Sequence, residues 1–204
     1  MKLLPAGDTA VLVELGDLEE VLSLYAQLDE DLPDGVVDMV PAAATLLLTL
    51  DPARTDVERL SRTVSTLTVG THSRAAAGEV EIPVVYDGED LADVGRLTGL
   101  GERGVVEAHT ATPWTVAFCG FAPGFGYMVG GDDRLRVPRR DNPRTRVPAG
   151  SVAIAGEFAS VYPRESPGGW QLIGRTALEV WDIGREPPAL LVPGTTVRYV
   201  EVTS

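Results

Sequence analysis

Residues 120–127 read Gly-Phe-Ala-Pro-Gly-Phe-Gly-Tyr, and residues 166–176 read Ser-Pro-Gly-Gly-Trp-Gln-Leu-Ile-Gly-Arg-Thr. Between these two segments glycine and proline recur every few residues. In a helix interior they cost roughly 1 and 3 kcal/mol respectively, so this part of the chain is not expected to be helical. Short apolar segments such as residues 152–155, separated by Gly and Pro turns, favour a closed or nearly closed β-barrel instead.

The same part of the chain is a basic island in an acidic protein. Residues 120–175 contain eight Arg and five Asp or Glu, whereas the whole chain of 204 residues has a net charge of −13. Guanidinium groups bind carboxylate and phosphate oxygens in pairs, so the island predicts an anion site. Six of its arginines lie close together in the sequence: Arg134, Arg136, Arg139, Arg140, Arg144 and Arg146. The alternative is that they form structural ion pairs with the acidic surplus.

Several motifs in this region resemble a known family. They read GFAPGFGYM, PRRDNPRTRVPAGSVAIAG, VYP and SPGGWQLIGRT, and the similarity is dense over residues 105–200 and looser over residues 7–50. The family is that of allophanate hydrolase subunit 1, or KipI, which includes B subunits of ATP-dependent 5-oxoprolinases. The resemblance implies a cyclophilin-like β-barrel for residues 78–204. One departure is Ala43-Ala44-Thr45, where the family commonly has an aromatic-Arg-Ser element.

The resemblance also implies an activity and partners. The chain is expected to be part of a complex that opens 5-oxoproline to glutamate with cleavage of ATP, and to be inactive alone. Its expected partners are a C-type protein similar to allophanate hydrolase subunit 2 and an A-type, LamB/YcsF-like subunit. ATP with Mg²⁺ is the expected co-substrate, without a tightly bound cofactor. Two other functions are open: a carboxyltransferase of the allophanate hydrolase or urea carboxylase type, which needs a biotin carrier, and a KipI-like module that binds a histidine kinase.

The amino-terminal part of the chain predicts a small α+β domain, residues 1–77. Apolar runs predict strands, and apolar stripes that follow capping pairs predict helices beginning near Asp17 and Thr55. The expected strands are residues 9–15, 36–40, 45–50 and 79–86, and the expected helices cover residues 18–28 and 57–67. The resulting β-α-β-β-α-β order is that of a ferredoxin-like unit. A small, polar stretch at residues 70–78 is a candidate hinge.

The second part of the chain opens with two expected helices and closes with two expected strands. The helices cover residues 91–98 and 102–109 and are separated by Gly-Leu-Gly. The strands cover residues 189–192 and 197–202 and are joined by a Pro-Gly turn.

Three residues are candidates for catalysis. Arg139 and Arg144 follow prolines that restrict the backbone in front of them, and the family frame supports the same two arginines. His109 lies at the end of a predicted helix, where the family resemblance favours a general acid–base or a phosphate donor. Its alternative role is a helix C-terminal cap.

Six further residues are candidates for binding substrate or nucleotide: Gly124, Phe125, Tyr127, Arg140, Gln171 and Arg175. The glycine-rich segment can direct backbone N–H groups at an anion, although tight turns beside bulky rings explain its glycines equally well. Gln171 and Arg175 have even spacing on one strand, so both can face one pocket. Exposed rings of Phe121, Phe125 and Tyr127 would suit a regulatory module.

Other kinds of site are not expected from this sequence. Lys2 is the only lysine, so there is no Walker A motif, and no metal-ligand spacing is present. Cys119 has no basic neighbour in the sequence and is expected to be a buried small apolar residue rather than a nucleophile. The negative charge argues against nucleic acid and anionic membranes. The absence of an apolar leader and of cysteine pairs predicts a cytoplasmic protein.

Overall fold

The computed structural model describes residues 1–70, 72 and 76–203. The chain divides into two compact units, Met1–Ala75 and Ala76–Ser204, which are described separately. The predicted hinge at residues 70–78 lies partly outside the described residues.

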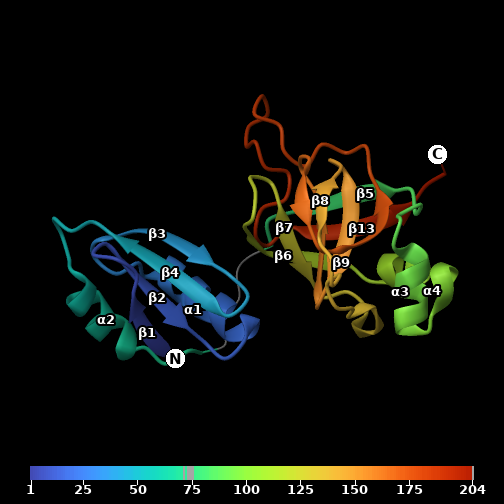
Figure 1. Ribbon diagram of the computed structural model, residues 1–204. Helices are drawn as coiled ribbons and strands as arrows, with labels where there is room; N and C mark the ends of the chain where they lie inside the picture. Colours follow the sequence, from blue (N-terminus) through green and yellow to red (C-terminus); the bar gives the residue numbers. More distant parts are fainter. Residues whose placement is uncertain (71, 73–75, 204) are drawn as a thin grey trace. The chain divides into compact units, whose positions relative to one another are not determined.

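The first unit is a four-stranded antiparallel sheet packed against two helices (Figure 1). Its elements are β1 Lys2–Pro5, β2 Ala10–Glu14, α1 Leu18–Glu30, β3 Val36–Pro41, β4 Thr45–Leu50 and α2 Val57–Ser65, with the sheet order β1-β2-β4-β3. Apolar side chains from the sheet and both helices form one core, for example Val13, Leu24, Leu48 and Leu60. The predicted α+β character of this part is confirmed.

Both helices of this unit begin at an aspartate whose side chain accepts a hydrogen bond from a backbone N–H three residues later. Asp17 accepts from the N–H of Glu20 at 2.9 Å, as the sequence predicts. The second helix begins at Asp56, which accepts from the N–H of Arg59 at 2.7 Å, so the predicted cap at Thr55 is wrong by one residue. Thr55 instead belongs to the preceding turn, where its N–H donates to the carbonyl of Asp51.

The predicted β-α-β-β-α-β order needs one correction. The strand at residues 79–86, here β5 Glu79–Val84, pairs in parallel with β13 Thr196–Glu201 of the second unit and not with the first sheet. The fourth strand of the first sheet is the amino-terminal β1, which runs antiparallel to β2 from the Lys2–Glu14 pair to the Pro5–Val11 pair. A four-residue strand that ends in proline is too short to produce a clear alternating pattern.

The second unit is built on seven strands that form a nearly closed barrel, in the order β12-β9-β10-β7-β6-β13-β5. Besides β5 and β13 these are β6 Trp114–Cys119, β7 Gly126–Val129, β9 Ser151–Ala155, β10 Phe158–Val161 and β12 Gln171–Arg175. The two edges of the sheet meet where Val85 and Arg175 exchange two backbone hydrogen bonds, each 2.9 Å long. The predicted barrel is therefore confirmed.

Helices α3 Leu91–Thr98 and α4 Gly101–Ala111 lie side by side at one end of the barrel (Figure 1). Their apolar residues join the barrel core, in which Val94 and Val105 pack with Ile82, Ile154 and Tyr199. Both predicted helices are confirmed. The predicted strand at 189–192 is wrong, because these residues do not pair with a strand. The N–H of Leu190 donates to the carbonyl of Val180, and Val192 and Thr195 bond to each other. Ala189 forms an isolated bridge with Trp181.

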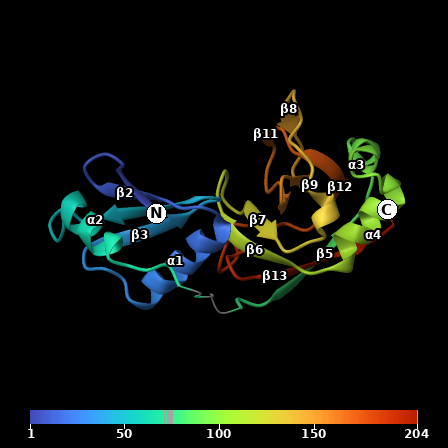
Figure 2. The same ribbon diagram turned by 90° about the horizontal axis from the view of Figure 1, so that it is seen from below.

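A second layer covers the other face of β9 and β12. Alternate residues of these strands separate into two clusters: Val152, Ile154 and Ile173 face the barrel core, whereas Ala153 and Leu172 pack with aromatic rings. The covering layer includes a two-stranded ribbon, β8 Arg144–Val147 and β11 Ser166–Gly168, which projects from the barrel in Figure 2. The short 3₁₀ helix η1 Asp133–Leu135 precedes this ribbon. The arginine-rich segment thus lies on the outside of the barrel.

Candidate functional site

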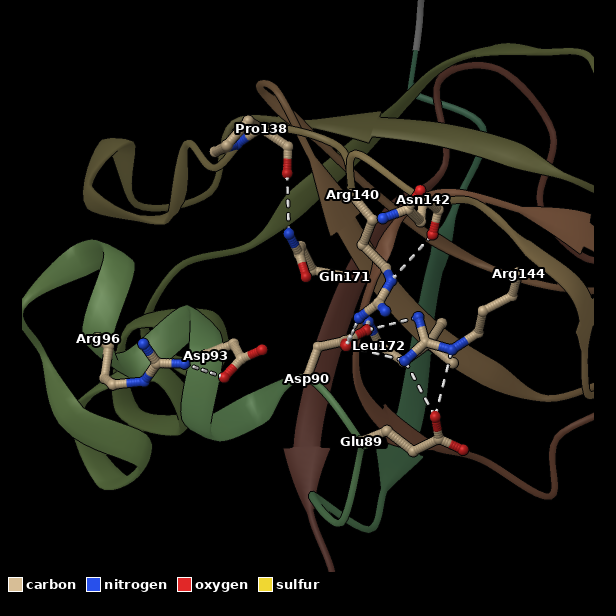
Figure 3. Close-up of polar contacts among 10 residues, drawn as sticks. All are labelled: Glu89, Asp90, Asp93, Arg96, Pro138, Arg140, Asn142, Arg144, Gln171 and Leu172. Atoms are coloured by element: carbon tan, nitrogen blue, oxygen red, sulfur yellow. Dashed lines mark hydrogen bonds and ion pairs between the residues drawn. The ribbon is translucent and has the colours of Figure 1, made fainter.

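A nearly buried carboxylate, Asp90, organises the arginines of this layer. It directly precedes α3, and its side chain is only 2% exposed. Arg144 donates to its two oxygens at 2.8 Å each, Arg140 donates through Nη1, and the N–H of Leu172 donates at 2.7 Å (Figure 3). Burial alone would raise the pKa of Asp90, but the hydrogen bonds of Arg144 and Leu172 and the charges of the two arginines outweigh it and hold this pKa below its usual value. Asp90 is therefore ionised at neutral pH.

Arg140 and Arg144, two of the predicted site residues, therefore form ion pairs with carboxylates. The Arg144 side chain is 15% exposed and also donates to Glu89 Oε2 at 3.0 and 3.2 Å. Arg140, at 31% exposed, shares the carboxylate of Asp90. For these two residues the geometry favours the structural interpretation over direct contact with a substrate. The sequence offers no signal for Asp90, because its partners lie 50 or more residues away and Asp-Gly-Glu-Asp before a helix reads as a simple helix start.

Arg139 is placed differently from its neighbours. It is exposed, and it makes no ion pair or hydrogen bond within the part of the chain that the structure describes. The residues on both sides of it are fixed: the carbonyl of Pro138 accepts from Gln171 Nε2 at 3.1 Å, and the N–H of Arg140 donates to the carbonyl of Gly169 at 2.7 Å (Figure 3 shows the first of these contacts). Gln171, a predicted binding residue, is therefore buried and stabilises the backbone of this segment.

Two tyrosines lie within the electrostatic reach of Arg139. Burial raises the pKa of Tyr127 and of Tyr162, and the positive charge of Arg139 partly offsets this rise at both phenols. Tyr127 stacks on Phe118 with 4.4 Å between the ring centres. Tyr162 packs edge-to-face on Phe125 at 5.2 Å. The positive charge of Arg139 thus acts on two members of a group of packed aromatic rings.

The glycine-rich segment builds this aromatic group. Gly124 has φ +81°, and a Cβ there would lie 2.6 Å from the Cβ of Trp181, so only glycine fits. Phe125 is 2% exposed and packs among the rings of Tyr127, Tyr162 and Trp170. The prediction that Phe125 contacts a ligand is therefore not supported. An exposed patch of three rings also fails to form, because only Phe121 is well exposed.

Phe121 has a backbone conformation that side chains rarely adopt. Its φ is +65°, the only positive value for a non-glycine residue in the described ranges, and the N–H of Ala122 donates to the carbonyl of Gly120 at 2.7 Å across it. Its ring is 58% exposed and lies 5.1 Å from Phe125 and 6.2 Å from Tyr162, centre to centre. Strained backbone with an exposed aromatic ring is common at functional sites.

His109, the third candidate for catalysis, is not accessible to a substrate. Its ring is completely buried in α4, 4.1 Å from the ring of Tyr199 between centres, and Nδ1 lies 2.7 Å from the hydroxyl of Tyr86. Burial lowers the pKa of His109 to about 3, so the ring is neutral. A neutral ring without access to solvent has no route to a substrate in this conformation, which argues against the predicted acid–base role.

Arg175, a further candidate, and Cys119 have partners of their own. Arg175 is exposed and donates to Asp87 at 2.9 Å, and an irregularity in β12 between Leu172 and Gly174 breaks the alternation that would have aligned it with Gln171. Cys119 donates to the carbonyl of Leu191 at 3.3 Å, and burial raises the pKa of its thiol to about 11, so it is not a thiolate nucleophile. Over the described ranges, no three His, Cys, Asp or Glu side chains come together to hold a metal ion, and no helix is long and apolar enough to cross a membrane.

The burial of His109 predicts a specific dependence of stability on pH. The unfolded chain binds a proton at this residue below its ordinary pKa of 6.5, but the folded chain does so only near 3. The free energy of unfolding therefore falls as the pH decreases from 6.5 towards 3, by up to about 1.4 kcal/mol per pH unit for one proton. Urea denaturation of the wild type and of His109→Gln between pH 7.5 and 4.5 measures this slope. Equal slopes for the two proteins would show that His109 is not buried as a neutral ring.

The comparison with known families matches this architecture. The model of the carboxyltransferase domain family, subdomain C and D, matches residues 1–191. A protein of Escherichia coli O157:H7, named as the B subunit of 5-oxoprolinase, is 42% identical over 209 residues, which cover 95% of this chain and 93% of that protein. A protein of the same name from Bacillus subtilis (strain 168) is 34% identical over 224 residues, covering 97% of this chain and 91% of its own length.

Solved structures agree with the sequence relatives. The crystal structure of TTHA0988 has a TM-score of 0.78 and 38% sequence identity over 97% of this chain, which spans only 40% of the TTHA0988 chain. The K. lactis urea amidolyase has a TM-score of 0.77 at 19% identity, covers 98% of this chain, and shares the fold over 15% of its own length. The chain therefore belongs to the carboxyltransferase domain family, subdomain C and D, together with the proteins named as B subunits of 5-oxoprolinase, as its sequence motifs predict.

Proposed function

We propose that this chain is the B subunit of an ATP-dependent 5-oxoprolinase complex, which hydrolyses 5-oxo-L-proline to L-glutamate. The observation that carries the proposal is its identity of 34 to 42% with three proteins named as B subunits of 5-oxoprolinase, over nearly the full length of both proteins in each comparison. The names of these relatives support a complex of several chains, and the partners we propose are a C-type and an A-type protein. We also infer a cyclophilin-like barrel and a cytoplasmic location, where ATP is plentiful.

The chemistry of a lactam explains why a basic site is useful. A lactam carbonyl is a poor electrophile, and transfer of the γ-phosphoryl group of ATP to its oxygen makes the carbonyl carbon reactive towards water. Negative charge then increases on the phosphoryl oxygens and must be stabilised by cations and N–H groups already in position. Mg²⁺ enters this proposal bound to the phosphates of ATP. Because the charges of Arg140 and Arg144 are already paired with Asp90, most of the cationic site for this step is expected to come from the partner proteins.

The test is phosphate release by the reconstituted complex. The chain is co-expressed with a C-type and an A-type protein, and phosphate is measured with ATP, with and without 5-oxoproline. We expect release that depends on 5-oxoproline and falls to background when any one of the three proteins is omitted. A stable assembly of all three proteins that releases no phosphate would overturn the proposal.

A carboxyltransferase is the second candidate, and the family description and the fold shared with urea amidolyase favour it. Carboxyl transfer requires a carboxylated biotin carrier as donor, whereas lactam hydrolysis does not. Product formation that depends on an added biotin carrier protein and bicarbonate would support this candidate.

A further inference from the structure

We propose that Arg139 binds the carboxylate of the substrate, and that the exposed ring of Phe121 and the partly exposed ring of Tyr127 contact the CH₂ groups of the lactam ring attached to that carboxylate. This inference rests on the proposed function and adds to it an anion-binding residue in this chain. It assigns Arg139 to substrate binding, in place of the catalytic role expected from the sequence.

The first argument is that Arg139 alone has an unused charge within its cluster. Each of the other five arginines of the segment is paired with a carboxylate: Arg134 with Asp132, Arg136 with Asp133, Arg140 and Arg144 with Asp90, and Arg146 with Glu165. Arg139 has no such partner among the residues that the structure describes. An exposed guanidinium with all its N–H groups available suits a planar, two-oxygen ligand such as a carboxylate.

The second argument is that the backbone on both sides of Arg139 is fixed. Gln171 is 6% exposed and holds the carbonyl before it, while Gly169 and Asp90 hold the residue after it. A residue that binds a ligand benefits from a fixed backbone, because less conformational freedom is lost on binding.

The third argument concerns what lies beside the guanidinium. The N–H of the next residue, Arg140, donates to the carbonyl of Gly169 at 2.7 Å, and Trp170, which follows Gly169, packs on the ring of Tyr127 at 5.5 Å between centres. The rings of Phe121 and Tyr127 each lie 5.1 Å from that of Phe125, and the charge of Arg139 acts on the phenol of Tyr127. Phe121 is held exposed by a strained turn. Together these residues place a cation near a partly exposed aromatic surface. A small carboxylic acid whose ring carries CH₂ groups matches both parts, and 5-oxoproline is such an acid.

The kinetic test compares a substrate that has the carboxylate with an analogue that lacks it. In the reconstituted complex, Arg139→Ala is expected to raise the KM for 5-oxoproline by about 10- to 100-fold, as for the loss of hydrogen bonds to a charged group. The same variant should leave inhibition by 2-pyrrolidinone, the same lactam without its carboxylate, unchanged. Arg136→Ala is the matched control, because it removes an arginine of the same segment that is paired with Asp133, and it should leave KM unchanged. A lower kcat with an unchanged KM would overturn the proposal in favour of a phosphoryl contact.

A second measurement does not depend on turnover, so it separates failure of this inference from failure of the proposed function. The arginine Nε–H signals of the ¹⁵N-labelled full chain are followed by NMR during titration with 5-oxoproline and then with 2-pyrrolidinone. The signal that is missing in Arg139→Lys should shift with the acid and not with the analogue. An inactive complex whose Arg139 signal still shifts would contradict the oxoprolinase activity and retain the anion site. An active complex whose Arg139 signal stays fixed, with KM unchanged in Arg139→Ala, would overturn the anion site alone.

Discussion

Replacing Asp90 with alanine is expected to lower the free energy of unfolding of the second unit by about 3 to 5 kcal/mol, the usual result of removing one partner of a buried ion pair. The variant would leave the charge of Arg144, at 15% side-chain exposure, and that of Arg140 without their main partner, and the N–H of Leu172 without an acceptor. All three tryptophans, Trp114, Trp170 and Trp181, lie in this unit, so their fluorescence during urea denaturation of the full chain reports on it.

Glu89 offers a matched control for this prediction. It contacts the same guanidinium of Arg144 but is 76% exposed, so Glu89→Ala is expected to cost less than about 1 kcal/mol. If Asp90→Ala does not accumulate in folded form, Asp90→Asn keeps the side-chain size and is measured instead, with a smaller loss expected. Losses of equal size for the Asp90 and Glu89 variants would contradict the view that Asp90 organises the arginines.

The second large effect is expected at Gly88, near the seam where the barrel closes. A Cβ at this position would lie 2.3 Å from the carbonyl oxygen of Leu172 and 2.4 Å from the carbonyl carbon of Ile173. Both are backbone atoms of β12, and the N–H of Asp90 already donates to that same oxygen, so neither side moves without breaking a contact. Gly88→Ala is therefore expected to lower the free energy of unfolding by about 3 kcal/mol, the upper part of the range for overpacking.

The control for Gly88 is a glycine with room for a methyl group. At Gly120 the nearest atom to an added Cβ is Cε2 of Tyr127 at 3.6 Å, an ordinary contact. Gly120→Ala should change the free energy of unfolding by less than about 1 kcal/mol in the same tryptophan assay. A barrel that tolerates Gly88→Ala as well as Gly120→Ala would show that β12 does not approach residue 88 as closely as described.

Local signals account for the parts of the fold that the sequence predicts. Asp17 with its partner three residues on, and the glycines around Leu100, are short-range features that mark helix ends wherever the chain lies in space. The predicted place of strand 79–86 in the first sheet is wrong because a strand's partner depends on contacts far along the chain, and β5 pairs with a strand more than 100 residues away. Likewise, residues 189–192 have the composition of a strand, but Leu191 is buried in the barrel core without pairing in the sheet, which composition does not reveal.

The site could be predicted only as a region. Composition indicates the basic segment, and the prolines before Arg139 and Arg144 favour these two arginines as site residues. Which arginine keeps a free charge depends on Asp90, about 50 residues earlier, and no local pattern marks that partner. His109 shows the same limit, since its burial depends on Tyr86, Trp114 and Tyr199, which lie on three different strands or loops.

The most direct test of the central proposal follows the lactam oxygen through the reaction. The complete complex is given ATP and 5-oxoproline labelled with ¹⁸O at the ring carbonyl, and the label is measured in the released phosphate and in glutamate. If ATP phosphorylates the lactam oxygen, that oxygen leaves with the phosphoryl group, so one ¹⁸O is expected in phosphate for each glutamate formed. Label that stays in the γ-carboxylate of glutamate, with unlabelled phosphate, would contradict the proposed path, in which ATP phosphorylates the lactam oxygen and water then attacks the carbonyl carbon.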